Sequence, residues 1–321
     1  MATKDVVLAF LEQHRGRFVS GPELADALGV SRTAVWKAIQ SLDAEGHTIT
    51  AVKNKGYRLE MNSDQLSEAG LHIFLPERYA SLPVVLFEKT DSTNTQAKRL
   101  SLEGAEHGTI VLACEQTAGR GRSGKSFFSP QSGLYITVIL KPPAGMADPQ
   151  KITIAAAVAV CRAIEAQTAL VPKIKWVNDV YLDGKKICGI LTEAVTDFES
   201  GGIESIVVGI GVNCVIPAEC IPPELRGIVG ALNAEGLSRN RLAADIAASV
   251  LDAFGDLEAP ALIEEYRRRS FLYGREISFT RNGERLSGTV TGISDAGNLL
   301  VLLNSGKMLS LSSGEVSIGR M

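Results

Sequence analysis

A run of glycines and cations, EQTAGRGRSGKSFFSP at residues 115–130, is the stretch of this sequence most suited to chemistry. Arg120 and Arg122 flank Gly121, and Lys125 follows Gly124. Three cations on a flexible backbone repel one another and pack against nothing, so they make a poor structural element. Their charge-assisted hydrogen bonds to phosphate or carboxylate contribute about 1.5–3 kcal/mol each. We therefore expect this loop to close over an anion, the alternative being a solvated surface loop.

The spacing Gly119-x-Gly121-x-x-Gly124 also matches the dinucleotide fingerprint G-x-G-x-x-G. That fingerprint requires a helix directly after the glycines, with its N-terminus facing pyrophosphate. Here Pro130 and Gly133 exclude a long helix, and a strand-like run follows them. The acidic residue expected about 20 positions further on is absent as well. The sequence context therefore excludes an NAD site.

Three further clusters could contribute to a site, although each is weak alone. They are Ser92-Thr93-Asn94, Lys185-Lys186 after the turn Asp183-Gly184, and GIGVN at 209–213. The first offers short hydrogen-bonding groups before a predicted helix, where plain helix capping is the alternative. Strand alternation turns the two lysines to opposite faces, so one of them can enter a site. Glycines in a strand allow close approach of a ligand to the backbone.

The elements that must hold these clusters alternate between strand-like and helix-like runs. Strands are predicted at 83–89, 109–116, 133–141, 173–177, 186–195 and 203–213, and helices at 95–103, 150–167 and 241–257. The helix at 150–167 is apolar nearly all round, so we expect it to be buried against the sheet. Because residues 183–184 signal a hairpin, the sheet is predicted to be mixed.

The N-terminal segment predicts a winged helix-turn-helix. Ser20 and Glu23 form a capping box at one helix start, and Gly29-Val30-Ser31 joins that helix to the next. A basic-tipped hairpin follows around Lys53-Asn54-Lys55-Gly56. Residues 1–60 carry eight basic and seven acidic residues, so placement rather than net charge favours DNA. The predicted DNA-binding residues are Ser31, Arg32, Thr33 and Lys37 on the second helix and Lys53 and Lys55 on the wing. A three-helix packing module is the alternative.

The fold class is therefore α+β multidomain, with three predicted domains. They are a winged helix-turn-helix at 1–62, a central mixed β-sheet with helices at 63–271, and a small SH3-like β-barrel at 272–321. The stretch EMNSD at 60–64 reads as a linker between the first two. Short strands punctuated by Gly and Asn predict the barrel, to which the residues assign no chemistry.

Composition narrows the class of protein further. The 321 residues carry a formal net charge of −3, which does not suit a generally basic nucleic-acid binder. The five cysteines are far apart and form no C-x-x-C pair, so we expect buried free thiols in a reducing cytoplasm and no metal-ligating set. No run reaches the ~20 apolar residues of a membrane span.

Taken together, the motifs resemble the biotin–protein ligases, and with the winged helix attached, the bifunctional biotin ligase/biotin operon repressor family. The five matching blocks are DSTN at 91–94, Gln116 with AGRGRSGKSFFSP, KWVND at 175–179, GKKICGIL at 184–191 and GIGVN at 209–213. They occur in the family's order, and the resemblance as a whole covers essentially the whole chain. The resemblance implies the biotin ligase fold, which is similar to that of class II synthetases.

The resemblance also implies roles for individual residues. The implied biotin-binding residues are Ser92, Thr93, Asn94, Gln116, Arg120, Gly121, Arg122 and Lys186. The implied nucleotide-binding residues are Gly119, Lys125, Phe127, Asp179, Gly209, Gly211 and Asn213. Lys186 and Arg122 are the implied catalytic pair. Two residues depart from the family pattern: Val177 stands where proline is usual, and Phe127 where tryptophan is common.

The implied reaction joins two anions. The biotin carboxylate attacks the α-phosphate of ATP to give biotinyl-5′-AMP and pyrophosphate, and Mg²⁺ accompanies the nucleotide, held mostly by phosphates and water. A lysine of the biotin carboxyl carrier domain of acetyl-CoA carboxylase then attacks, forming an amide and releasing AMP. Operator DNA is the second implied partner, bound by a homodimer. A lipoate–protein ligase and a ligand-sensing transcription factor without ligase activity are the alternatives.

Overall fold

The computed structural model describes residues 2–143, 148–196, 202–281, 283–314 and 316–318. The chain divides into two compact units. One comprises residues 1–81 with 234–248, and the other comprises residues 82–233 with 249–321. This division is coarser than the three domains predicted at 1–62, 63–271 and 272–321, whose boundaries remain a prediction.

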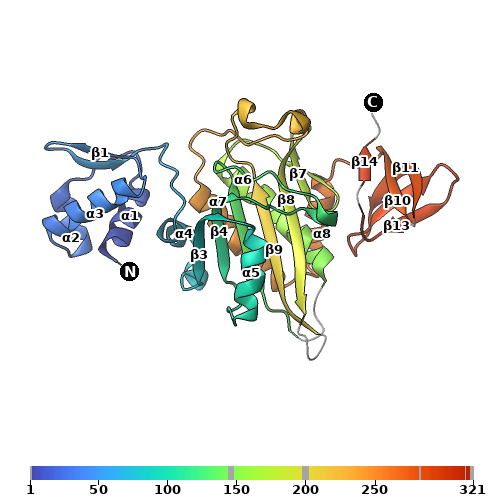
Figure 1. The fold of residues 1–321 in the computed structure, drawn as a ribbon, viewed down its shortest axis with the longest axis horizontal. Helices are drawn as coiled ribbons and strands as arrows, with labels where there is room; N and C mark the ends of the chain where they lie inside the picture. Colours follow the sequence, from blue (N-terminus) through green and yellow to red (C-terminus); the bar gives the residue numbers. More distant parts are fainter. Residues whose placement is uncertain (1, 144–147, 197–201, 282, 315, 319–321) are drawn as a thin grey trace. The chain divides into compact units, whose positions relative to one another are not determined.

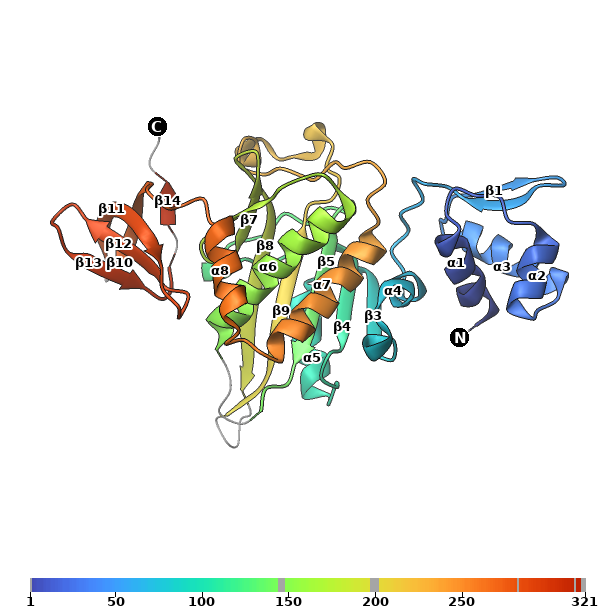
Figure 2. The same cartoon turned by 180° about the vertical axis from the view of Figure 1, so that it is seen from behind.

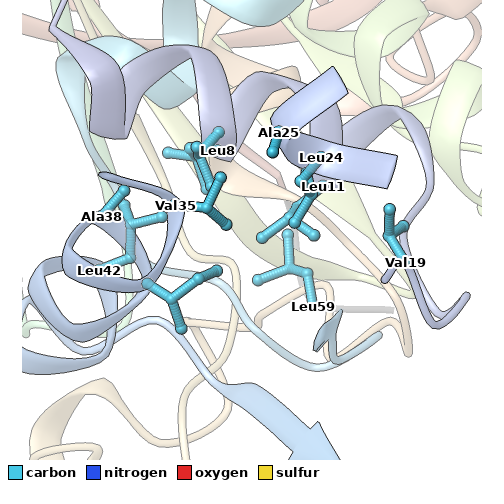
Figure 3. Close-up of a cluster of buried hydrophobic side chains, with 11 residues drawn as sticks. Leu8, Leu11, Val19, Leu24, Ala25, Val35, Ala38, Leu42 and Leu59 are labelled. Atoms are coloured by element: carbon cyan, nitrogen blue, oxygen red, sulfur yellow. The ribbon is translucent and has the colours of Figure 1, made fainter. Parts of the chain in front are cut away.

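The first unit contains the predicted winged helix-turn-helix. Its elements are α1 (Thr3–Gln13), α2 (Gly21–Leu28), α3 (Arg32–Ala44), β1 (Ile49–Val52) and β2 (Gly56–Leu59). Leucine and valine side chains from the three helices and β2 form one core, with Leu8, Leu24 and Leu59 almost completely buried (Figure 3). Removing this apolar surface from water supplies the main force that holds the helices together.

The turn between α2 and α3 follows its sequence signals. The Ser20 hydroxyl accepts a hydrogen bond from the Glu23 amide, completing the predicted capping box. Gly29 ends α2 at φ +64°, a left-handed conformation that favours glycine. The Ser31 hydroxyl then caps α3 by accepting from the Ala34 amide at 3.1 Å. The predicted helix-turn-helix is therefore confirmed.

The stretch at 60–64 is fixed more firmly than its expected role as a linker implied. The Arg15 guanidinium donates to the carbonyls of Glu60 and Ser63, at 2.9 and 2.7 Å. The Asp64 carboxylate accepts from the backbone and side chain of Arg239, at 2.7 and 2.6 Å. These partners lie far away in sequence, so no local pattern could reveal them. Helix α4 (Glu68–Phe74), which was not predicted, follows this stretch.

The second unit is built on a seven-stranded mixed sheet. Its strands are β3 (Val84–Thr90), β4 (Ile110–Gln116), β5 (Leu134–Leu140), β6 (Lys173–Lys175), β7 (Asp179–Leu182), β8 (Lys185–Thr196) and β9 (Ile203–Val212). They lie in the order β3-β4-β5-β9-β8-β7-β6. The pair β3 and β4 is parallel and the other neighbours are antiparallel, so the prediction of a mixed sheet is confirmed.

Helices cover both faces of this sheet. Helix α5 (Thr93–Leu102) lies on one face, and α6 (Pro149–Gln167) and α8 (Pro260–Arg269) lie on the other (Figures 1 and 2). As predicted, α6 is buried along most of its length. Helix α7 (Arg239–Phe254) matches the predicted helix at 241–257, whereas α8 was not predicted. Helix α5 begins two residues earlier than expected, so Thr93 and Asn94 lie in its first turn.

The C-terminal strands form the predicted small all-β element. Strands β10 (Glu276–Arg281), β11 (Glu284–Ile293), β12 (Leu299–Leu303), β13 (Met308–Leu311) and β14 (Val316–Ile318) form an antiparallel sheet in the order β13-β12-β11-β10-β14. The Trp176 indole N–H donates to the carbonyl of Gly297 at 2.8 Å, which joins this sheet to the KWVND block. Residues 319–321 of the predicted barrel lie outside the described residues.

The buried cysteines agree with the expectation of free thiols. Cys114, Cys161, Cys188 and Cys214 are buried, and Cys220 is exposed. Burial raises the pKa of the Cys161 thiol to about 12. Because the thiolate is the reactive form, this side chain acts as a small apolar group.

Candidate active site

Two adjoining cavities lie beside the glycine and cation stretch, here called the arginine loop (residues 117–127). The larger cavity has a volume of about 230 Å³ and the smaller about 30 Å³. Arg120, Phe127, Gly189 and Leu191 line both of them. The two spaces therefore form neighbouring compartments of one site.

The arginine loop doubles back on itself in a tight turn. The Gly121 amide donates to the Lys125 carbonyl at 2.7 Å, and the Phe127 amide donates to the Gly119 carbonyl at 2.8 Å. A Cβ atom on Gly119 would lie 2.4 Å from the Ser129 hydroxyl, so only glycine fits there. The turn brings Arg120, Arg122 and Lys125 to the larger cavity.

Lys186 reaches the same cavity from the β7–β8 hairpin. Asp183 and Gly184 turn the chain at φ +49° and +76°, which confirms the predicted hairpin turn. The Lys186 ammonium lies 2.7 Å from the Asp179 carboxylate, and its side chain is 25% exposed. Lys185 is exposed, so one of the two lysines enters the site as predicted.

The larger cavity has a strong excess of positive charge. Among the described residues that line it, the cations are Arg120, Arg122, Lys125, Lys175 and Lys186, and the carboxylate is Asp179. A concave surface lined by charge of one sign concentrates ions of the other sign. This compartment is therefore suited to a ligand that carries several negative charges.

The smaller cavity is lined by short polar groups. The Gln116 carboxamide oxygen accepts from the Thr93 amide at 2.8 Å, and its NH₂ group donates to the Ser129 hydroxyl at 3.0 Å. Ser92 stands at the cap position of α5, but its hydroxyl does not cap the helix. Helix capping therefore does not account for Ser92, which lines the smaller cavity.

Asn94 lines the smaller cavity but is fully committed to the protein. Its NH₂ group donates to the Leu191 carbonyl at 3.0 Å and to the Glu193 carboxylate at 2.9 Å. Its oxygen accepts from the Thr137 hydroxyl at 2.8 Å. These bonds tie the first turn of α5 to the sheet, so Asn94 shapes the pocket and has little hydrogen-bonding capacity left for a ligand.

Three glycines provide the space that Phe127 and Asn94 occupy. A Cβ atom on Gly211 would lie 2.5 Å from the Phe127 ring, and one on Gly189 would lie 2.9 Å from it. A Cβ atom on Gly209 would lie 2.0 Å from the Asn94 oxygen. Gly209 and Gly211, predicted on the nucleotide side, line the smaller cavity with Ser92 and Thr93.

Asn213 is buried and is absent from the described residues that line either cavity. Its NH₂ group donates to the Gly230 carbonyl at 2.8 Å, and its backbone amide donates to the Ile187 carbonyl at 2.8 Å. The side-chain oxygen Oδ1 is buried and accepts no hydrogen bond from the described residues. A buried carbonyl oxygen without a donor costs free energy, which a ligand donor would recover.

Several lining residues were not identified from the sequence as site residues. Trp176, Asn178 and Gly189 line the larger cavity, and all three belong to blocks singled out as motifs. The Asn178 side chain donates to the Ile190 carbonyl at 2.9 Å, which holds the KWVND turn against β8. The peptide between Trp176 and Val177 is cis. Phe127, the other departure from the family pattern, lies 5.9 Å from the Lys186 ammonium.

On the winged helix, each of the predicted DNA-binding residues is accessible to a partner. Ser31, Arg32, Thr33, Lys37, Lys53 and Lys55 are all exposed. Trp36, which the sequence reasoning missed, is 53% exposed on the same helix. Because Arg32 and Thr33 lie four and three positions before Trp36, the three side chains share one face of α3.

The described parts of the chain contain neither a cluster of metal-ligating side chains nor a membrane-spanning helix. No three His, Cys, Asp or Glu side chains gather there closely enough to hold a metal ion. No helix there has the length and apolarity to span a bilayer.

The sheet, the cation-lined cavity and the polar pocket together define a carboxylate-activating ligase. Residues 86–213 match the biotin/lipoate A/B protein ligase family, residues 4–58 an HTH domain, and residues 272–319 the biotin protein ligase C-terminal domain. A solved structure of biotin protein ligase from Aquifex aeolicus, in complex with biotin and ATP, is 25% identical with a TM-score of 0.64. The match covers 74% of this chain and 99% of the Aquifex aeolicus chain.

Relatives that match over nearly the whole chain identify the family within the ligases. The bifunctional ligase/repressor BirA of Bacillus subtilis is 32% identical, with 98% of each chain covered. The protein of the same name from Escherichia coli is 28% identical, with 94% of each chain covered. The chain belongs to this family of bifunctional ligase/repressors.

Proposed function

We propose that this protein joins biotin to a lysine of a biotin carboxyl carrier domain, through biotinyl-5′-AMP, and represses transcription through its winged helix. The observation that carries the proposal is the pair of adjoining cavities, one polar and narrow, the other rich in cations. A neutral cyclic urea suits the first, and two reacting anions suit the second.

In the narrow compartment, biotin is recognised by paired hydrogen-bonding groups. Ser92, Thr93 and Gln116 supply the donors and acceptors for the ureido ring, while Asn94 keeps the first turn of α5 in place. Gly209 and Gly211 leave room for Asn94 and the Phe127 ring, which shape this compartment beside the sheet. A site built to hydrogen-bond its ligand discriminates strongly against analogues that lack those groups.

In the cationic compartment, Lys186 and Arg122 offset the repulsion between the biotin carboxylate and the α-phosphate of ATP. Lys186 lies where the β7–β8 hairpin fixes its backbone, with its amide donating to the Ile228 carbonyl at 2.8 Å. Such preorganised charge stabilises the transition state without reorganising during the reaction. The arginine loop also shelters the adenylate from water, because a mixed anhydride hydrolyses readily.

The nucleotide side includes Asp179 and Asn213. The family resemblance assigns Asn213 to this side, and its buried oxygen has no hydrogen-bond donor among the described residues. Asp179 is the carboxylate of the cavity and presents the hard oxygen donors that Mg²⁺ prefers. Asp179, which is paired with Lys186, would supply one ligand to Mg²⁺. Phosphate and water oxygens would supply the other ligands. The ion would reduce the negative charge of the phosphates.

The transfer step is tested by supplying a carrier domain. With labelled biotin and ATP, we expect label to appear on the acceptor lysine in step with AMP release. Lipoate in place of biotin should give no AMP, whereas the reverse preference would establish a lipoate–protein ligase. Ligand binding without any AMP would establish a sensor that lacks ligase activity.

For the winged helix, we propose that α3 enters the major groove and the wing contacts phosphates. The exposed positions of Arg32, Thr33 and Lys37 on α3 support base contacts, and Lys53 and Lys55 support contacts to the backbone. A homodimer would present two such helices to successive major grooves of a palindromic operator, about 34–36 Å apart. Sedimentation velocity with and without biotin and ATP tests the homodimer, which we expect to form with both ligands present.

The wing makes a quantitative prediction. Replacing Lys53 and Lys55 by glutamine should weaken operator binding and reduce the slope of log affinity against log salt by about 4, since the homodimer loses four lysines and each neutralises about one phosphate. Gel-shift titration at several salt concentrations measures that slope. The control is Lys4→Gln, which removes a lysine of α1 paired with Glu45 at 2.6 Å. Equal slopes for the wild type and the wing variant would show that the wing does not contact phosphates.

A further inference from the structure

Glu193 on β8 is a half-buried carboxylate that no sequence motif identified. Its side chain is 17% exposed and meets three donors. Oε1 lies 2.7 Å from the Lys98 ammonium and 3.3 Å from the Arg120 guanidinium, and Oε2 accepts from the Asn94 NH₂ group at 2.9 Å. Burial alone would raise the pKa of Glu193, but the hydrogen bonds from Lys98 and Asn94 outweigh it and lower the pKa. The carboxylate is therefore ionised at neutral pH.

The three donors come from the two segments that enclose the smaller cavity. Asn94 and Lys98 lie one turn apart on α5, whose start carries Ser92 and Thr93. Arg120 belongs to the arginine loop on the other side. Glu193 is absent from the described residues that line either cavity. The Glu193 carboxylate thus connects α5 to the arginine loop, although Glu193 itself does not line the smaller cavity.

The three donors to Glu193 differ in how firmly the protein holds them. Lys98 and Asn94 lie on a helix that packs against the sheet, so the helix itself limits their movement. The Arg120 side chain is 51% exposed and belongs to a glycine-rich turn. Without the carboxylate, Arg120 would also face the Lys98 ammonium with no charge between them. Arg120 is therefore the least firmly held of the three donors.

We propose that Glu193 is a positioning residue that holds Arg120, and with it the arginine loop, over the smaller cavity. The proposal rests on the proposed function, because it assigns Glu193 to the retention of biotinyl-5′-AMP. Glu193 touches no reacting atom. It acts by fixing the cation that closes the biotin end of the site, so its loss should speed escape of the adenylate more than it slows formation.

The test measures how long the protein retains the adenylate. The protein is loaded with labelled biotin and ATP, freed of small molecules by gel filtration, and chased with unlabelled biotin. Glu193→Gln should shorten the retention half-time about tenfold, the effect of losing one charge-assisted hydrogen bond. Glu193→Asp, which keeps the charge but shortens its reach, should give an intermediate half-time.

A double-mutant cycle shows whether the effect passes through Arg120. In an Arg120→Gln background, Glu193→Gln should change retention by less than about twofold. Equal effects in the two backgrounds, or wild-type retention by Glu193→Gln, would overturn the proposal. The matched control is Glu165→Gln, which removes a carboxylate bound to Arg269 at 2.7 Å, outside both cavities. It should retain the adenylate normally even if it melts at a lower temperature.

The cycle also separates this inference from the function on which it rests. A wild-type protein that accumulates no biotinyl-5′-AMP would contradict the proposed function. A wild type that retains the adenylate, together with a Glu193→Gln protein that retains it equally long, would contradict only the role of Glu193. Thermal unfolding of each variant shows that the proteins compared are folded.

Discussion

Replacing Lys186 by alanine should abolish adenylate formation, lowering its rate by about two to three orders of magnitude, as loss of one preorganised charge does in other active sites. The ammonium lies in the cavity with a single carboxylate partner, Asp179, at 2.7 Å. Without this ammonium, the negative charge of the reacting carboxylate and phosphate is no longer balanced by Lys186. Biotin-dependent release of pyrophosphate measures the rate.

The neighbouring lysine provides the control. Lys185 is exposed on the opposite side of the same strand, so Lys185→Ala should form the adenylate at close to the wild-type rate. Thermal unfolding of both variants tests whether the hairpin remains intact. A Lys186→Ala protein that is folded and still forms adenylate at the wild-type rate would show that the activating charge lies elsewhere.

Replacing Gly209 by alanine should damage both stability and biotin binding. The new Cβ atom would lie 2.0 Å from the Asn94 oxygen, and Asn94 cannot withdraw without breaking its bonds to Leu191, Glu193 and Thr137. Overpacking and the loss of buried hydrogen bonds should together lower the free energy of unfolding by about 2–4 kcal/mol. Urea unfolding measures the change, and calorimetry should find biotin binding lost.

Two further variants make that prediction specific. Gly292→Ala adds a methyl group to another strand glycine, but its nearest neighbour is 4.0 Å away, so its stability should change little. Asn94→Ala removes the amide that obstructs Gly209→Ala. The double variant should therefore be more stable than the sum of the two single effects. If the effects of the two substitutions on stability simply add, the new Cβ atom at position 209 does not contact Asn94.

Local sequence signals predicted much of this fold because they determine local structure directly. The capping box of Ser20 and Glu23, the left-handed Gly29 and the turn Asp183-Gly184 each specify a backbone conformation, and the structure has all three. The burial of α6 followed from its apolar residues alone. Helix α4 was missed because it is only 7 residues long, and α8 because it ends in a run of arginines that hides its apolar face.

The site was predictable where one motif supplied both the residue and its direction. Alternation along the hairpin predicted that one of Lys185 and Lys186 enters the site, and the family resemblance then selected Lys186. The cations of the arginine loop could be read from composition. The role of Glu193 could not be predicted from the sequence, because its partners Lys98 and Arg120 are far away in sequence. Strand alternation does place Gly189, Leu191 and Glu193 on one face, a signal that could have identified it. The Asn94 network was hidden for the same reason, since its partners lie on β5 and β8.

The central claim is that the cation-lined cavity activates the carboxylate of biotin and that a lysine then takes the product. Incubation of the whole protein with labelled biotin, ATP and a biotin carboxyl carrier domain tests it most directly. We expect one biotin amide per carrier, one AMP released for each, and no label on a carrier whose acceptor lysine is arginine. Bound biotin with no AMP and no label on the carrier would show that the cavity does not activate biotin.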